Sequence, residues 1–244
     1  MMAFIIGFLA GGFGSLVGLG GGVLIVPLLT GVLKVDQHQA HGTSIVAVAL
    51  TAIVGSVAYA LGGEVDWGAA LLLAVTAMVA ARLGAKSTKR LRARVLRRVF
   101  GLFLLLVAFV LPFKNRLPHV AAGGAGVYSA LILLLAGALA GFLSGLLGIG
   151  GGTVMVPALV LGAGLPQHLA QGTSLAAMVL PSLIGAYTHL QHGNVRLDLV
   201  PGLLLGVALG AFLGGQVALG IPEETLRLIF AVILVGMAIR YLRS

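Results

Sequence analysis

Two glycine triplets in the sequence could bind an anion through the backbone. They are Gly20, Gly21 and Gly22, and Gly150, Gly151 and Gly152, and each stands before an apolar stretch. Glycine lets a ligand approach the backbone closely, and the first N–H groups of a helix have no partner within that helix. The positive end of the helix dipole lies at the same place, so phosphate, sulfate and carboxylate groups bind there. The triplets therefore predict two anion-binding half-helix ends.

Close helix packing in lipid is the alternative use of small residues. One small residue per turn is enough to bring two membrane helices together. We favour this interpretation for Gly7, Gly11, Gly137 and Gly141. Packing does not require three consecutive glycines, so we favour the anion site for the two triplets.

A second motif, Gly-Thr-Ser, also occurs twice. Its hydroxyls could donate to an oxyanion, although they could equally bond back to a helix carbonyl or cap a helix start. His41 precedes the first copy and Gln171 precedes the second. We therefore expect the substrate-binding residues to be Gly20, Gly21, Gly22, His41, Thr43, Ser44, Gly150, Gly151, Gly152, Gln171, Thr173 and Ser174.

The histidines divide into two groups. His38 and His168 are expected to be solvated at the mouths of membrane spans. His41, His189 and His192 fall within or near the end of an apolar stretch, where an ionisable group points to function or lies at the interface. An imidazole group titrates near neutral pH, so His41 could couple anion binding to protonation. No metal-ligand spacing, nucleotide motif or cysteine occurs, so we predict no metal site, no cofactor and no enzyme.

These residues must be positioned by membrane helices. Hydrophobic residues make up 59% of the 244-residue chain, charged residues 9%, and the mean hydropathy is +1.14. Such a chain spans a lipid bilayer. The net charge of +9 does not indicate nucleic acid, because eight of the fifteen basic residues fall in the acid-free stretch 82–98. A basic loop of this kind is typical of the cytoplasmic face of an inner membrane and could contact anionic lipids.

The chain contains two copies of one unit, offset by 130 residues. Aligned without gaps, Gly7–Leu50 and Gly137–Leu180 agree at 20 of 44 positions. We predict a first repeat over 1–113, a linker over 114–125 and a second repeat over 126–244. Each repeat should contain a leading segment that breaks at its glycine triplet, followed by three spans, near 42–62, 66–85 and 95–112 and near 170–191, 199–219 and 225–242.

The loop charges favour an inverted arrangement of the two repeats. A leading segment that folds back leaves three crossings in each repeat, and the second copy is then inverted. With the basic loop inside, inversion also places Lys34, Arg196, Arg240 and Arg243 inside and Glu64, Asp66, Glu223 and Glu224 outside; Lys114 and Arg116 are the exceptions. The predicted fold is thus an all-α membrane protein with inverted repeats and discontinuous helices around a central site.

The paired motifs Gly-Leu-Gly-Gly-Gly-x₄-Pro and Gly-Ile-Gly-Gly-Gly-x₄-Pro, each followed by Gly-Thr-Ser, resemble the TauE/SafE sulfite exporter family over nearly the whole chain. The resemblance implies an inner-membrane transporter of sulfur-containing anions such as sulfite or organosulfonates. We expect a small anionic substrate, a lipid environment, no nucleic-acid partner and possible homo-oligomers. A channel-like or auxiliary membrane subunit is the alternative function, and an intramembrane enzyme is a weaker third.

Overall fold

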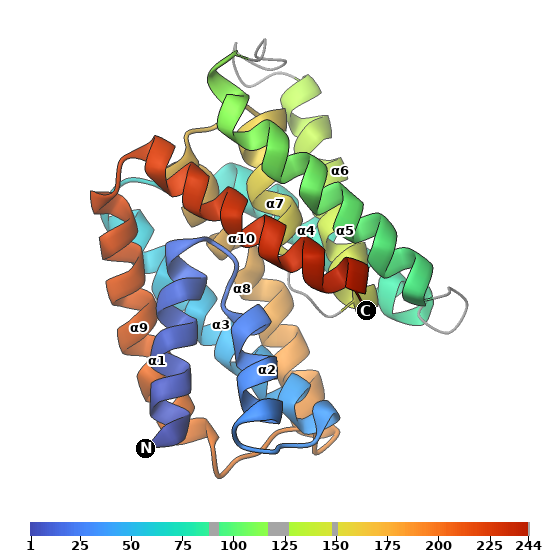
Figure 1. Ribbon diagram of the computed structural model, residues 1–244, viewed down its shortest axis with the longest axis vertical. Coiled ribbons are helices and arrows are strands. Elements are labelled where there is room, and N and C mark those ends of the chain that lie inside the picture. The colour runs from blue at the N-terminus through green and yellow to red at the C-terminus, as the bar shows by residue number, and fades with distance from the viewer. Residues whose placement is uncertain (88–92, 117–126, 148–150, 244) are drawn as a thin grey trace.

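The computed structural model describes residues 1–87, 93–116, 127–147 and 151–243, and all regular structure in these ranges is helical (Figure 1). The first half contains α1 (Met2–Leu16), α2 (Gly22–Gly31), α3 (Gln37–Leu61), α4 (Trp67–Ser87), α5 (Ala93–Val110) and the 3-10 helix η1 (Leu111–Arg116). The second half contains α6 (Val127–Leu147), α7 (Gly152–Pro157), the π-helix η2 (Ala158–Gly162), α8 (Gln167–Gln191), α9 (Val200–Gly220) and α10 (Glu223–Arg243).

The prediction of an all-α membrane protein is confirmed. Four helices of the described ranges, α3, α8, α9 and α10, are long and apolar enough to cross a bilayer. The central pair, α3 and α8, each have 25 residues. The Asp36 carboxylate starts α3 by accepting a hydrogen bond from the backbone N–H of His38, which is a typical N-cap. Both central helices therefore begin on polar residues, before the apolar stretches that predicted them.

The leading segment of the first repeat breaks at glycines and folds back. Gly18, Gly20 and Gly21 all have positive φ angles, of 73°, 76° and 78°. Gly21 lies directly beside Ala10 of α1, since a Cβ atom on Gly21 would lie 2.4 Å from the Ala10 carbonyl oxygen. The break occupies residues 17–21, slightly before the predicted one. Pro27 lies inside α2 without ending it.

The two arms of each leading segment differ in length, which the prediction of a glycine-broken segment left open. The first arms, α1 and α6, have 15 and 21 residues, and the arm after the first break, α2, has 10. At 1.5 Å per residue, α6 is about 30 Å long, enough for a bilayer core. The two arms of the first segment, α1 and α2, are both shorter than this. Residues 148–150 of the second break lie outside the described ranges.

Glycines bring helices of the two repeats together, as the packing prediction required. A Cβ atom on Gly7 of α1 would lie 2.2 Å from the carbonyl oxygen of Leu203 in α9. A Cβ atom on Gly141 of α6 would lie 2.1 Å from the carbonyl oxygen of Ala77 in α4. The interpretation of Gly7, Gly11, Gly137 and Gly141 as packing residues is confirmed. In Figure 1 α1 and α9 accordingly lie side by side.

The main helix contacts have counterparts when the repeats are exchanged. The contact of α1 with α9 corresponds to that of α6 with α4, and α3 with α9 corresponds to α8 with α4. The equivalent helices α3 and α8 run antiparallel, because Gly42 lies against Asn194 and Gly55 against Leu175. An inverted repeat requires such antiparallel counterparts; the orientation of the repeats relative to a membrane stays a prediction.

Two predicted features fall partly outside the described residues. The basic stretch 82–98 is interrupted by the gap at 88–92 between α4 and α5. The predicted linker 114–125 begins in η1 and then enters the gap at 117–126.

Candidate functional site

A cavity of about 500 Å³ lies between the central helices α3 and α8. Its other walls come from α4, α6 and the glycine-rich starts of α2 and α7. The lining residues are Leu19, Gly22, His41, Ser44, Ile45, Val48, Met78, Ala81, Arg82, Ser144, Gly151, Met178, Pro181, Ser182, Ile184, Gly185, Thr188 and His189.

Basic and hydroxyl groups supply the polar part of this cavity. Arg82 comes from α4, and the rings of His41 and His189 lie edge to face with centroids 5.6 Å apart. The Nδ1 atom of His189 is buried and has no hydrogen-bond partner. No acidic residue occurs among the lining residues that the structure describes. The cavity therefore suits an anion better than a cation.

Four of the predicted site residues line the cavity: Gly22, His41, Ser44 and Gly151. Gly20 lies just behind its wall, since a Cβ atom there would meet Val48 and Met178 at 3.1 and 3.4 Å. Gly21 packs against α1, and Gly152 packs against the carbonyl group of Gly18, so neither is part of the lining. Gly150 lies outside the described residues.

The first two residues of each Gly-Thr-Ser motif hold a loop of the other repeat. The Thr43 hydroxyl oxygen accepts a hydrogen bond from the backbone N–H of Arg196 at 3.0 Å. At the equivalent place, the Thr173 hydroxyl oxygen accepts from the backbone N–H of Asp66 at 2.9 Å. Both threonines are completely buried.

The glycines of the two motifs make room for these same loops. A Cβ atom on Gly42 would lie 2.1 Å from the carbonyl oxygen of Asn194, and one on Gly172 would lie 2.0 Å from that of Glu64. The glycine therefore admits a loop carbonyl, and the threonine accepts the N–H two residues later. We call these two arrangements the Thr43 latch and the Thr173 latch.

An ion pair stiffens the loop held by the Thr43 latch. The Arg196 guanidinium donates to both carboxylate oxygens of Asp198, at 2.8 and 2.7 Å. This hydrogen bonding raises the pKa of Arg196 and lowers the pKa of Asp198. Both groups lie at the surface, so the pair contributes little to stability.

The remaining predicted residues, Gln171 and Ser174, are buried in the half of the bundle away from the cavity. The Tyr59 hydroxyl donates to the Gln171 side-chain oxygen at 2.8 Å, and the Ser174 hydroxyl donates to the Gly18 carbonyl at 3.1 Å. Gln171 Nε2 is buried without a hydrogen-bond partner. These side chains fill the protein core beside the end of α1.

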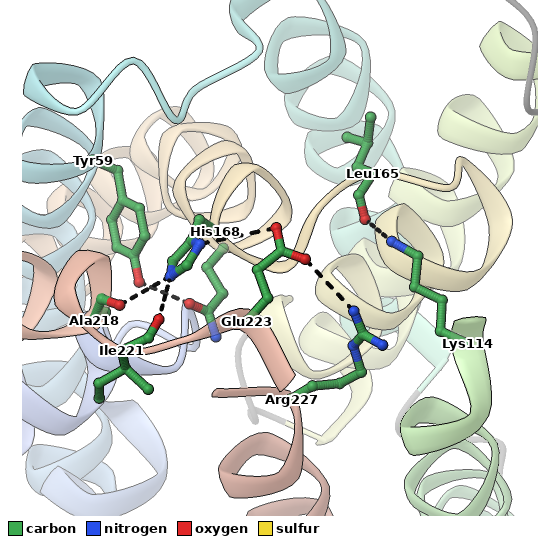
Figure 2. Close-up of polar contacts among 9 residues, drawn as sticks. Tyr59, Lys114, Leu165, His168, Ala218, Ile221, Glu223 and Arg227 are labelled. Atoms are coloured by element: carbon green, nitrogen blue, oxygen red, sulfur yellow. Dashed lines mark hydrogen bonds and ion pairs between the residues drawn. The ribbon is translucent and has the colours of Figure 1, made fainter. Parts of the chain in front are cut away.

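A separate polar cluster joins α8, α10 and η1 (Figure 2). His168 was expected to be solvated, but its Nε2 atom lies 3.0 Å from the Ala218 carbonyl and 3.1 Å from the Ile221 carbonyl. Two acceptors at one nitrogen require that nitrogen to carry the proton, so the expectation of a solvated His168 is wrong. Its Nδ1 atom faces Glu223 at 4.0 Å.

Glu223 continues this cluster towards η1. Glu223 pairs with Arg227 at 3.6 Å, and the Lys114 ammonium donates to the Leu165 carbonyl. Burial, and then the charge of Arg227, lower the pKa of Lys114, while Glu223 raises it. These contacts tie helix ends together and lie apart from the cavity lining.

Three residues of interest were not among the predicted site residues. Arg82 was counted only with the basic loop, and His189 was left between a functional and an interfacial role. Tyr59 and His189 are equivalent under the offset of 130, as are His41 and Gln171. The offset of 130 pairs Tyr59 with His189 and could have drawn attention to both. Tyr59, however, lies beyond residues 7–50, where the two copies agree closely.

The antiparallel helix pairs and the cavity between them define a multi-pass membrane transporter, and the comparisons with known proteins agree. The family model described as sulfite exporter TauE/SafE matches residues 2–241. The chain belongs to this family.

Relatives are found in bacteria and archaea. A probable membrane transporter protein, YunE, of Bacillus subtilis is 30% identical, covering 95% of this chain and 93% of its own. One from Xylella fastidiosa is also 30% identical, covering 96% and 90%. The probable membrane transporter MJ0441 of Methanocaldococcus jannaschii is 29% identical, covering 76% and 70%. No solved structure matches the chain significantly.

Proposed function

We propose that the protein is a secondary transporter of sulfur-containing oxyanions, such as sulfite or organosulfonates, and that the cavity between α3 and α8 binds the anion. The observation that carries the proposal is the grouping of Arg82, His41 and His189 in one cavity whose described lining has no carboxylate. A guanidinium group forms strong, charge-assisted hydrogen bonds with oxyanions. The family description, which names sulfite, supports the sulfur class.

The start of α2 supports the same site. Gly22 lines the cavity at the first residue of this helix, so the helix dipole adds positive potential there. Ser44, from α3, lines the same part of the cavity. A tetrahedral or pyramidal oxyanion would then be bound between the start of α2 and the side chains of Arg82, His41 and His189.

The inverted arrangement is part of the proposal. The Thr43 latch places Arg196 beside the start of α3, and the Thr173 latch places Asp66 beside the start of α8. The loops at the start of α3 thus carry Lys34 and Arg196, together with Asp36 and Asp198, and the loop at the start of α8 carries Glu64 and Asp66. By the positive-inside rule, the end with the cavity residue Arg82 faces the cytoplasm. The structure is then an inward-open state in a plasma membrane.

Flux into proteoliposomes tests the function. Purified protein would be reconstituted and supplied with radiolabelled sulfite, and separately with organosulfonates. A carrier predicts saturable uptake that other members of the substrate class inhibit. Uptake that rises linearly without saturation would favour the channel-like alternative, and no uptake of any substrate would favour an auxiliary subunit.

A further inference from the structure

The two central helices present equivalent residues to different environments. His41, Ser44 and Ile45 of α3 line the cavity. Their equivalents in α8, at an offset of 130, are Gln171, Ser174 and Leu175, and each is 0% exposed. The repeats therefore share a sequence pattern but differ in packing around the central helices.

The same difference appears in the second half of each helix. Ser182, Thr188 and His189 of α8 line the cavity. The equivalent residues of α3 are Ala52, Ala58 and Tyr59, which are all 0% exposed. One end of the α3–α8 interface is therefore open and the other is closed.

A hydrogen bond seals the closed end. The Tyr59 hydroxyl donates to Gln171 Oε1 at 2.8 Å, and both side chains are buried (Figure 2 shows Tyr59). The equivalent pair at the open end is His189 and His41, whose rings meet only edge to face. Gln171 Nε2 lies at the closed end without a partner, which is unfavourable for a buried amide. An arrangement that hydrates this end would satisfy it.

We propose that Tyr59 and Gln171 form one gate of the transport path and that His41 and His189 form the equivalent gate at the other end. The structure has the Tyr59–Gln171 gate closed and the His41–His189 gate open. In the second state the Tyr59–Gln171 hydrogen bond breaks, Leu175 lines a cavity that opens where α8 begins, and the cavity lined by the two histidines closes. This inference rests on the proposed transport function, because a gate presupposes a path.

Cysteine accessibility tests the gate without measuring transport. The chain has no cysteine, so each introduced thiol reports alone. L175C reports on the closed end, because Leu175 lies one turn beyond Gln171 on the same face of α8. I45C is its matched equivalent on the open end. In the purified full-length protein in detergent, N-ethylmaleimide should modify I45C quickly and L175C slowly.

Removal of the Tyr59 hydroxyl should release the closed gate. In Y59F we expect the labelling rate of L175C to rise about five- to tenfold, the factor that corresponds to the loss of one typical hydrogen bond. Y187F is the matched control, because Tyr187 is an exposed tyrosine of α8. It should leave the L175C rate unchanged.

A second variant distinguishes the loss of the gate from misfolding. Q171L removes the acceptor at similar size, and I45C labelling together with the thermal unfolding midpoint verifies that each variant is folded. The gate is disproved if L175C reacts as fast as I45C in the unaltered protein, or stays slow in both Y59F and Q171L. A gate confirmed by labelling in a protein that moves no sulfur anion would disprove the proposed substrate but not the gate.

Discussion

The hydroxyl oxygen of Thr43 in α3 accepts a hydrogen bond, 3.0 Å long, from the backbone nitrogen of Arg196, a residue of the other repeat. We expect T43V to destabilise the protein by about 1–2 kcal/mol, because a partly buried N–H group loses its acceptor. The thermal unfolding midpoint in detergent measures this loss. T173V should have a similar effect, because the Thr173 latch has the same geometry.

The serine variant separates a latch from a substrate ligand. T43S keeps the hydroxyl and should restore most of the stability lost in T43V. If T43V instead keeps the unfolding midpoint of the unaltered protein while its affinity for the anion falls, the latch interpretation is wrong and Thr43 serves the substrate.

Gly42 and Gly172 should tolerate no side chain. In G42A or G172A the new Cβ atom would overlap a loop carbonyl at 2.1 or 2.0 Å, so the loop must move. We expect a cost of about 3 kcal/mol, the upper end for an overpacked site. G236A is the control, because nothing lies within 4 Å of a Cβ atom there. It should be neutral or stabilise α10 by up to about 1 kcal/mol. Equal unfolding midpoints for G42A and G236A would contradict the close approach.

The inverted orientation predicts opposite faces for two exposed loops. A single cysteine in K34C should react with a membrane-impermeant maleimide from the cytoplasmic side, and one in E224C from the other side. Both residues are exposed in the structure, so access depends only on the face. Right-side-out and inside-out vesicles provide the comparison, and labelling of both cysteines from one side would refute the inversion.

Arg82 should contribute directly to anion affinity. R82Q removes the guanidinium from the cavity, and we expect the dissociation constant to rise about 10- to 100-fold, since hydrogen bonds to charged groups contribute about 1.5–3 kcal/mol. Calorimetric titration with an organosulfonate measures this dissociation constant. R98Q alters an exposed arginine of α5 that does not line the cavity and should leave affinity unchanged. Equal affinities for R82Q and R98Q would exclude the cavity as the site.

His41 should make transport depend on pH. Protonation adds positive charge to a cavity that also holds His189 and Arg82, so anion uptake measured over about pH 5 to 8 should fall as the pH rises and the imidazole loses its proton. An organosulfonate suits this assay because its own charge is constant over the range. H41Q should flatten the profile, and H38Q, at an exposed position of the same helix, should not. An unchanged pH profile of uptake in H41Q would show that His41 does not have this role.

The sequence predicted the helices well because each span is a long apolar stretch. Boundaries were less accurate at α3, which was expected from residue 42 but begins at Gln37. Its first turn is polar, and the Asp36 cap rather than hydropathy determines its start. The lengths of the two arms could not be predicted, because glycine marks where a helix ends but not how far the arm before it extends.

The candidate site was only partly predictable. The 130-residue offset identified His41 and Gln171 as counterparts, yet nothing local reveals that one lines a cavity while the other is bonded to Tyr59. That difference comes from packing between repeats that have separated in sequence. The threonines were recognised as special by their recurrence, but recurrence does not distinguish a ligand for substrate from an acceptor for a distant loop.

The exchange of helix contacts between the repeats has a consequence for the ancestry of the protein. Because α1 packs mainly on α9, and α6 on α4, the largest helix contacts of each half are with the antiparallel copy. A half-length ancestor with this packing would have been stable only as a pair of identical chains inserted in opposite directions. Fusion of two such copies into one chain would fix the two directions and would let each half change separately, and His41 and Gln171 are equivalent positions that differ in this way.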